Sequence, residues 1–421
     1  MMITMPTNGP AFADVTGSLA QDLALPEIHH DPYPYYDWLR REHPMHQTAY
    51  GAWVVSRHAD ATRVLRDPTF SSNSFGNNEN FAAIRPMLEE QLGIGELLRL
   101  QERAMLFLDP PDHTRLRRLV SKAFSTRAVD ALRPRAEEVV AGLLDDIEAK
   151  GEMDVICDLA YPLPITMICE MIGVPVADRE LFEQWTPSAV KVLDPSDDFS
   201  LLQEANEAIT HFVDYFRDLI ASRRRAPGED LLSGLIAAED EGDRLTEQEL
   251  LSTLILLLIA GHETTVNLIG NGMLALLRHQ DQLSRLRSDP ALIGSAVEEM
   301  LRFDSPVQLT GRTALAEQEV AGETVAKGSE VIVLLGAANR DPQQFPNPDG
   351  LDIGRGDRNH IAFGGGIHVC LGAPLARLEG KSAIGGAVAR WSHLELVGDE
   401  PDRKETITLR GLKSLRVAVS R

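Results

Sequence analysis

The sequence has few cysteines and a deficit of positive charge. Its three cysteines include no CxxC pair, which argues against a disulfide framework and a structural zinc site and favours the reducing cytoplasm. A formal net charge of −22 disfavours nucleic acids and anionic lipid surfaces as partners, because both attract basic patches. The composition therefore predicts a cytoplasmic protein that does not bind nucleic acid.

The sequence also lacks a long uninterrupted apolar run. Its most apolar stretch, residues 250–260, is interrupted by Ser252 and Thr253. This stretch is well short of the roughly 20 residues that span a bilayer. Residues 1–20 have neither the basic start nor the apolar block of a signal peptide. We predict no membrane span and a loose N-terminal tail over residues 1–20.

Hydrophobic periodicity predicts a mixed chain in which helices dominate. A helix is expected over residues 113–124, and a capping box of Thr246 and Glu249 is expected to begin a long apolar helix. Alternating patterns predict strands at residues 51–56, 319–333 and 407–419. Residues 70–100 have an irregular, polar pattern followed by a helical piece, which is typical of a mobile loop near a site.

A glycine-rich loop presents one cysteine near the C-terminal end. Residues 363–372 read Phe-Gly-Gly-Gly-Ile-His-Val-Cys-Leu-Gly, directly before a predicted helix. Glycines let the backbone lie close to a flat ligand, and amides at a helix start stabilise a thiolate. A dinucleotide loop is excluded because Val369 occupies its third glycine position. A lone cysteine is usually an inert apolar residue, and we interpret Cys157 and Cys169 in this way.

A second chemical group lies in the middle of the apolar helix. There Ala260 and Gly261 are followed by the acid Glu263 and the alcohol Thr264. The missing side chain of Gly261 leaves room for a ligand, and the Thr264 hydroxyl can bond to the carbonyl four residues back and loosen the helix. A zinc-protease motif is excluded because Val266 replaces its second histidine. Alone, this stretch could equally be a solvent-facing patch on a buried helix.

Both segments resemble the cytochrome P450 family. The family's haem-ligating pattern Phe-Gly-x-Gly-x-His-x-Cys-x-Gly is matched at every fixed position by residues 363–372, and its Ala-Gly-x-Asp/Glu-Thr segment by residues 260–264. The resemblance implies that Cys370 is the axial ligand of haem b, and that Glu263 and Thr264 relay protons to dioxygen. It implies further contacts with the haem at Gly261, Phe363, Gly364 and Gly372.

The resemblance covers almost the whole chain, from about Pro32 onward. It implies the family's fold, a mainly α body with a small β-rich lobe, in which the haem lies between the long central helix and the cysteine-ligand loop. We therefore expect a single domain over residues 21–421, and we expect a monomer.

Three further groups of residues take roles from the same resemblance. A structural triad, which supports the fold and is not catalytic, consists of Glu299, Arg302 and Arg355. Contacts to the haem carboxylates are expected from His113, Arg117, Arg312 and His368. A basic face expected to meet an acidic ferredoxin contains Arg115, Arg118 and Lys122. A simple solvated helix face remains the alternative for this last group.

The resemblance implies a monooxygenase of the soluble bacterial type, with a place in secondary metabolism. O2 is its co-substrate, and its electrons come from NAD(P)H through a ferredoxin reductase and a ferredoxin. The expected substrate is a hydrophobic terpenoid, steroid, macrolide or fatty-acid derivative, bound by a pocket that includes Ile259, Ala260, Val307, Gln308, Leu309 and Leu412. Two alternatives are a P450 that uses peroxide directly and a non-catalytic haem-thiolate sensor.

Overall fold

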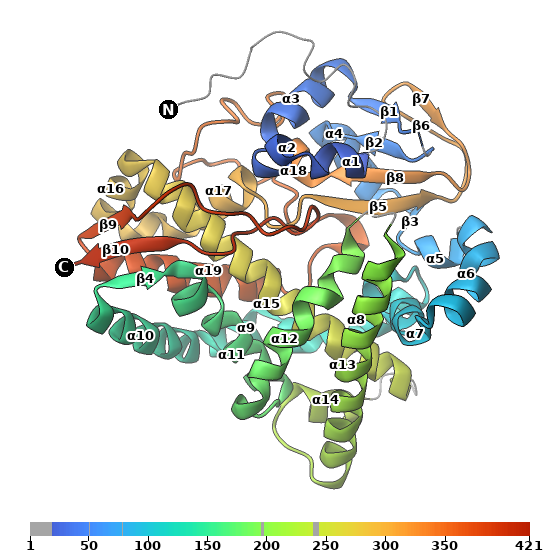
Figure 1. Ribbon diagram of the computed structural model, residues 1–421, viewed down its shortest axis with the longest axis horizontal. Coiled ribbons are helices and arrows are strands. Elements are labelled where there is room, and N and C mark those ends of the chain that lie inside the picture. Colours follow the sequence, from blue (N-terminus) through green and yellow to red (C-terminus); the bar gives the residue numbers. More distant parts are fainter. Residues whose placement is uncertain (1–18, 50, 78, 195–197, 239–243) are drawn as a thin grey trace.

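The protein is described by a computed structural model that covers residues 19–49, 51–77, 79–194, 198–238 and 244–421. Helices make up most of the described chain, and the sheets are small (Figure 1). The α-helices are α1 (Leu19–Ala24), α2 (Pro26–His30), α3 (Tyr33–Glu42), α4 (His58–Arg66), α5 (Ser74–Asn77), α6 (Glu79–Leu92), α7 (Gly95–Arg103), α8 (Asp112–Ser121), α9 (Thr126–Ala131), α10 (Arg133–Lys150), α11 (Pro162–Ile172), α12 (Arg179–Val190), α13 (Phe199–Arg225), α14 (Leu231–Ala237), α15 (Glu247–Arg278), α16 (Gln280–Ser288), α17 (Ile293–Phe303), α18 (Leu335–Ala338) and α19 (Ala373–Arg390).

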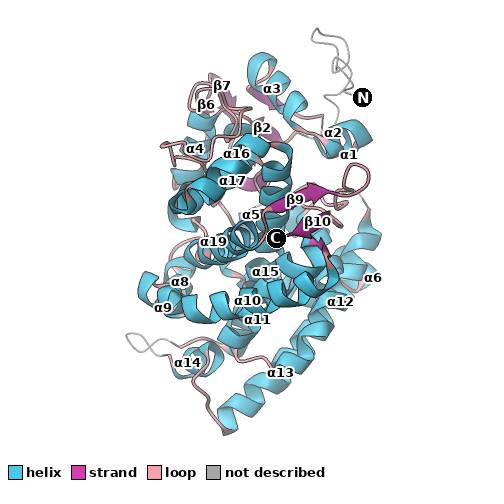
Figure 2. Ribbon diagram, turned by 90° about the vertical axis from the view of Figure 1, so that its left-hand side faces the viewer, coloured by secondary structure: helices cyan, strands magenta, loops and turns pink. Residues whose placement is uncertain are grey.

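The strands form three separate sheets. Their bounds are β1 (Met45–Gln47), β2 (Trp53–Val55), β3 (Phe70–Ser71), β4 (Glu152–Asp154), β5 (Leu309–Ala314), β6 (Gln318–Val320), β7 (Glu323–Val325), β8 (Glu330–Leu334), β9 (His393–Leu396) and β10 (Arg416–Ser420). The first sheet has the order β1-β2-β8-β5-β3, in which only the β2–β8 pair is parallel. The other sheets have the orders β4-β10-β9 and β6-β7. The first sheet and the helices around it form a lobe beside the helical body (Figures 1 and 2).

Helix α15 runs through the helical body. Its 32 residues give a length of about 48 Å at 1.5 Å per residue. It begins at the predicted capping box, because the Thr246 side chain accepts from the Glu249 backbone N–H and the Glu249 carboxylate accepts from the Thr246 backbone N–H. Helices α11, α13, α17 and α19 pack against it. The acid and alcohol of the sequence analysis therefore lie near the middle of a rigid, buried helix.

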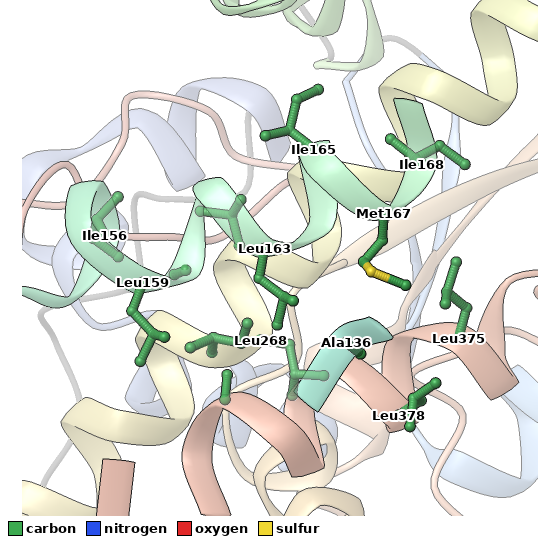
Figure 3. Close-up of a cluster of buried hydrophobic side chains, with 14 of the residues drawn as sticks. Ala136, Ile156, Leu159, Leu163, Ile165, Met167, Ile168, Leu268, Leu375 and Leu378 are labelled. Carbon is green, nitrogen blue, oxygen red and sulfur yellow. The ribbon is translucent and has the colours of Figure 1, made fainter. Parts of the chain in front are cut away.

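The largest hydrophobic core joins α15 to the helices on either side of it. Figure 3 shows Met167 of α11 pointing toward Leu375 and Leu378 of α19, and α15 contributes Leu268 to the same cluster. All four side chains are buried. Burying a Leu or Met side chain contributes about 1.5–3 kcal/mol. This packing fixes the start of α19, and thus the cysteine loop, relative to α15.

Most of the predicted elements are present. Helix α8 and the 3₁₀ turn Lys122–Phe124 cover the helix predicted at 113–124, and β2 lies inside the strand predicted at 51–56. Strands β6, β7 and β8 account for the pattern at 319–333. The prediction for 407–419 was right only at its end, where β10 begins at Arg416. Irregular backbone precedes β10. It contains isolated β-bridges, one of which pairs Leu409 with Val307.

The helical piece expected within residues 70–100 is present, and helices cover more of this region than the irregular pattern suggested. After the short strand β3, this region folds into α5, α6 and α7. Buried leucines on α7, among them Leu97 and Leu98, give that helix an apolar face, and α7 packs against α13 and α15. The polar Ser, Asn and Gly residues that suggested a loop are confined to the stretch before α6.

Two helical segments are apolar and long enough to cross a membrane, Val155–Ile172 and Glu247–Arg278. The prediction that the apolar run is too short to span a membrane does not hold for Glu247–Arg278, because the helix that contains the run is 32 residues long. In both segments 67% of the tested window is buried inside the protein. Core helices of this kind pass the same length and composition test, so the two segments are weak signals of a span.

Candidate functional site

The cysteine loop has a backbone that only glycine accommodates easily. Gly364 and Gly366 have φ values of +71° and +64°. A Cβ atom on Gly366 would also collide with the backbone carbonyl of Leu65 on α4. The Cys370 N–H donates to the Phe363 carbonyl at 2.9 Å, which closes the loop on itself. The glycines thus permit a tight loop pressed against α4.

The Cys370 sulfur lies at the N-terminal end of α19. Desolvation raises the pKa of its thiol, while hydrogen bonds from the backbone N–H groups of Gly372 and Ala373 lower it. The side chain is nevertheless exposed. The other two cysteines differ, because burial raises the pKa of Cys157 and of Cys169 without any bond from a helix start.

The four residues predicted to hold haem carboxylates come together from three parts of the chain. His113 and Arg117 lie on α8, Arg312 on β5, and His368 on the cysteine loop. The imidazole rings of His113 and His368 are 4.2 Å apart, and Arg117 donates to the carbonyl of Val369 at 2.6 Å. Burial and the neighbouring charges of His113, Arg312 and Arg117 lower the pKa of His368 to about 3.

This cluster has no anionic partner among the described residues. No ion pair there involves Arg117 or Arg312, although burial lowers the pKa of Arg312 to about 10. Both ring nitrogens of His113 and Nε2 of His368 are buried without a hydrogen-bond partner. Buried donors of this kind call for an anionic acceptor. A flat, dianionic group held at one end by this cluster and bonded to the Cys370 sulfur satisfies both halves of the site, and haem is such a group.

The middle of α15 presents one accessible face. Ala260 is exposed, and Ile259 and Thr264 are partly exposed, although most of the helix is buried. The Thr264 hydroxyl donates to the Ala260 carbonyl at 2.9 Å, as expected from the sequence. Gly261 has a different role from the predicted one, because its missing Cβ would meet Ile168 of α11 at 3.2 Å. Close packing of the two helices, and not room for a ligand, requires glycine there.

The Glu263 carboxylate does not face Thr264. It is 9% exposed and forms a short ion pair with the ammonium of Lys404, in the segment that precedes β10. The Lys404 N–H donates to the Gly411 carbonyl at 3.1 Å, which anchors this segment as a hairpin. No motif in the sequence marks Lys404, because it lies 141 positions from its partner.

The predicted triad is present. Arg302 donates two bonds of 2.8 Å to the Glu299 carboxylate, and Arg355 donates to the same carboxylate at 3.0 and 3.1 Å. The Glu299 and Arg302 side chains are each 1% exposed. The remaining donors of Arg302 reach backbone carbonyls of the 339–350 segment, as its bond to Pro348 at 2.8 Å illustrates. The triad fixes the chain that leads into the cysteine loop.

Two predicted pocket residues lie elsewhere. Leu412 is fully buried in the main core near Gly270, and the Gln308 amide is buried and donates to the Ser305 carbonyl at 2.7 Å. The difference at Gln308 follows from the alternation of side chains along residues 307–309. Val307 is partly exposed, and the next side chain, Gln308, faces the other way. Leu309 is 7% exposed.

The predicted basic face divides into two parts. Arg118 and Lys122 are exposed. Arg115 instead forms an ion pair with Glu249, and its side chain is only 21% exposed. This contact joins α8 to the capping box of α15, so Arg115 is a structural contact and not part of an open docking face.

Sequence reasoning missed a third charged group beside the cysteine loop. Arg377 of α19 pairs with Glu298 of α17, which also pairs with His360. The only signal was that Arg377 follows Cys370 by two helical turns, a spacing that points it back toward the loop.

Comparisons with known proteins agree with this geometry. The family model for cytochrome P450 matches residues 91–415. The chain is 40% identical to the biotin biosynthesis cytochrome P450 of Bacillus subtilis (strain 168), over 95% of this chain and 99% of the relative. It is 42% identical to the vitamin D(3) 25-hydroxylase of Pseudonocardia autotrophica, over 96% and 98%. The crystal structure of P450BioI in complex with hexadec-9Z-enoic acid ligated acyl carrier protein is similar at a TM-score of 0.87, with 40% identity over 94% of this chain and 99% of that chain.

Proposed function

The chain belongs to the cytochrome P450 family and is an oxidoreductase, and we propose that it inserts one oxygen atom of O2 into a C–H bond of a hydrophobic small molecule, with Cys370 as the axial ligand of its haem. One observation carries the assignment of the site. The exposed sulfur at the start of α19 lies beside a buried cationic cluster that forms no ion pair among the described residues, because Arg117 of that cluster donates to the carbonyl of Val369, the residue before Cys370.

In this mechanism the haem, when bound, supplies the binding and one-electron chemistry of dioxygen. The protein supplies its position and its electrostatic environment. When haem is bound, the Cys370 sulfur would be its thiolate ligand, supported by the backbone N–H groups of Gly372 and Ala373, and the guanidinium groups of Arg117 and Arg312 would bind its carboxylates. The imidazoles of His113 and His368 supply the remaining donors.

Proton delivery is assigned to Thr264 and Glu263. Because the Thr264 proton is used in the bond to the Ala260 carbonyl, its oxygen is free to accept a bond from water. A carboxylate has no proton to give, so Glu263 would have to leave the Lys404 ammonium and take up a proton from solvent before it could pass one to that water. Lys404 is thus a positioning residue for this step.

The substrate is proposed to be apolar, because the accessible wall of α15 consists of Ile259, Ala260 and Thr264 and offers a single hydroxyl. The relatives' names include a vitamin D(3) 25-hydroxylase, whose named substrate is a hydrophobic small molecule. A substrate bound to an acyl carrier protein is a second candidate, since P450BioI is known in such a complex.

Absorbance of the reduced, CO-bound protein tests the haem assignment. We expect a thiolate-type Soret band that Cys370→Ser abolishes. Cys157→Ser, on the far side of the α15 core, is the matched control and should leave the band unchanged. A thiolate-type band that survives in the Cys370→Ser variant would refute the ligand assignment.

Titration of the ferric protein tests the substrate class. Terpenoids, steroids, macrolides and fatty acids are added singly, and acyl carrier protein carrying a fatty acid is added separately. A low-spin to high-spin shift with a free compound identifies its class and supports a free substrate. A shift only with the carrier-bound acyl chain would replace that proposal with the carrier-bound one.

Electrons are proposed to arrive from a ferredoxin and its NAD(P)H-dependent reductase, with Arg118 and Lys122 steering the acidic partner. Arg118→Glu should slow reduction by ferredoxin, and the slowing should diminish at high salt. Unchanged reduction would remove this docking surface. Product formation with peroxide alone would favour the peroxide-using alternative, and reductant consumption without product from any bound ligand would favour a sensor.

A further inference from the structure

A buried charge network lies beside the cysteine loop and outside the triad. The Arg377 guanidinium donates to the two Glu298 carboxylate oxygens at 2.6 and 2.9 Å. The His360 Nε2 is 3.1 Å from the same carboxylate. Because His360 Nδ1 accepts a bond from the Ala362 N–H at 3.3 Å, Nε2 carries the proton and donates to Glu298. The network is therefore satisfied with a neutral imidazole.

Burial separates this network from an ordinary surface ion pair. The side chains of His360 and Glu298 are 3% and 10% exposed, and that of Arg377 is 33% exposed. Burial alone would raise the pKa of Glu298. The hydrogen bonds from His360 and Arg377 have the larger combined effect and lower this pKa to about 2. The carboxylate is thus permanently charged and holds Arg377 in one position.

Arg377 lies between Glu298 and the cysteine loop. Its guanidinium stacks over the Phe363 ring, 4.5 Å from the ring centroid. The backbone carbonyl of Phe363 accepts the Cys370 N–H at 2.9 Å. The Arg377 charge also lowers the pKa of the Cys370 thiol. One fixed cation is therefore joined through a single residue to the proposed iron ligand, while its counter-ion lies on the far side.

We propose that Arg377 is a positioning residue that raises the reduction potential of the Cys370-bound iron, and that Glu298, itself held by His360, keeps Arg377 in place and partly offsets its charge. The proposal rests on the assignment of Cys370 above. Reduction of the ferric haem adds one electron to the site, so a nearby fixed cation stabilises the reduced state and a nearby anion destabilises it. The two partners of one ion pair should thus shift the potential in opposite directions.

The test is spectroelectrochemical titration of the purified haem-loaded protein with a one-electron chemical reductant. Saturating imidazole keeps the iron six-coordinate and low-spin in every variant, which removes differences in water ligation. Arg377→Leu should lower the midpoint potential, by up to about 59 mV if the one-electron equilibrium changes tenfold. Glu298→Gln should raise it, because Arg377 then lacks its counter-ion.

Three controls separate charge from folding. Arg377→Lys keeps the cation and should restore most of the potential lost in Arg377→Leu. Arg390→Leu removes a cation from the same helix about 20 Å further along, where it pairs with Asp145 and Glu148, and should leave the potential unchanged. If Arg377→Leu fails to retain haem, Glu298→Gln alone still decides the sign.

Shifts of the same sign in Arg377→Leu and Glu298→Gln would overturn the proposal, since a disturbed loop would then explain both. No shift in Glu298→Gln, or an equal shift in Arg390→Leu, would also overturn it. A haem spectrum without thiolate character in the unmutated protein would instead refute the assignment of Cys370, independently of these comparisons.

Discussion

The cysteine side and the acid side of the molecule are built in opposite ways. The cysteine side comprises residues 363–372 with α8 and the starts of α17 and α19, and its buried groups without partners are hydrogen-bond donors such as the His113 ring. On the acid side, the middle of α15 with Lys404, the charged Glu263 already has a partner. The groups without partners there are neutral, as in His262 Nε2 and the Tyr161 hydroxyl.

The difference indicates which step of the proposed function depends on each side. The donors of the cysteine side come from α8, β5 and the cysteine loop and lie together, so their arrangement suits a dianionic group. The acid side must break the Glu263–Lys404 ion pair before the carboxylate can act. We therefore expect changes on the cysteine side to alter stability and haem retention, and changes on the acid side to alter the coupling of electrons to product.

The largest loss of stability is expected from Arg302→Met in the triad. It leaves the Glu299 carboxylate, 1% exposed, with Arg355 as its remaining cation. Breaking a buried pair costs about 3–5 kcal/mol. Denaturant unfolding followed by far-UV circular dichroism measures this loss.

The control is Arg285→Ala, which breaks an ion pair with Asp352 in which both side chains are about half exposed. That pair should be worth about 0–1 kcal/mol. Equal losses in the two variants would show that the triad is no more important to the fold than a surface pair.

Glu379 of α19 links the two sides and is expected to give stability a pH dependence. Burial raises the pKa of Glu379 to about 8, and both oxygens of its carboxyl group are buried without a hydrogen-bond partner among the described residues. Between about pH 4.5, its unfolded value, and pH 8, the folded state binds the extra proton, so stability falls as pH rises through this range. The slope from one group is at most about 1.4 kcal/mol per pH unit.

Unfolding of the Glu379→Gln variant at several pH values measures this contribution. The amide is a neutral isostere, so the variant should lose the slope and be more stable than the parent at pH 8. A slope that is unchanged by the substitution would place the titrating group elsewhere.

A smaller loss of stability is expected from Lys404→Met on the acid side. The variant leaves Glu263 buried without a cation, but Lys404 itself is 24% exposed, which reduces the cost to roughly 1–3 kcal/mol. The double variant with Glu263→Gln should recover most of that loss, because no charge is then left unpaired. Independent, additive effects in this cycle would mean that the pair does not hold the acid in place.

The smallest loss of stability, under about 1 kcal/mol, is expected from Thr264→Ala, since it removes one hydroxyl bond to a helix carbonyl. Its effect on chemistry should be larger, with more peroxide released per electron consumed and less product. Thr210→Ala on α13 removes the same kind of bond, to the Asn206 carbonyl, and should leave coupling unchanged. Unchanged coupling in Thr264→Ala would remove this residue from proton delivery.

The sequence predicted the cysteine side well because its residues are close together in the chain or carry a strong pattern. The loop at 363–372, the Glu299–Arg302 spacing and the imidazole of His368 could each be read locally. It predicted the acid side less well, since Gly261 turned out to pack against Ile168 and Glu263 to pair with Lys404. Both partners come from distant segments, and no local spacing reveals them.

By itself, the sequence determined the family, the position of the proposed cysteine ligand and the long central helix, because each depends on residue types at fixed short spacings that local backbone geometry converts directly into structure. Only the tertiary structure decided which charges meet. It joined Arg377 to Glu298, paired Glu263 with Lys404, and brought His113, Arg312 and His368 close together. Burial and long-range packing determine such pairs, because a charge removed from water must find whichever partner the fold brings within reach.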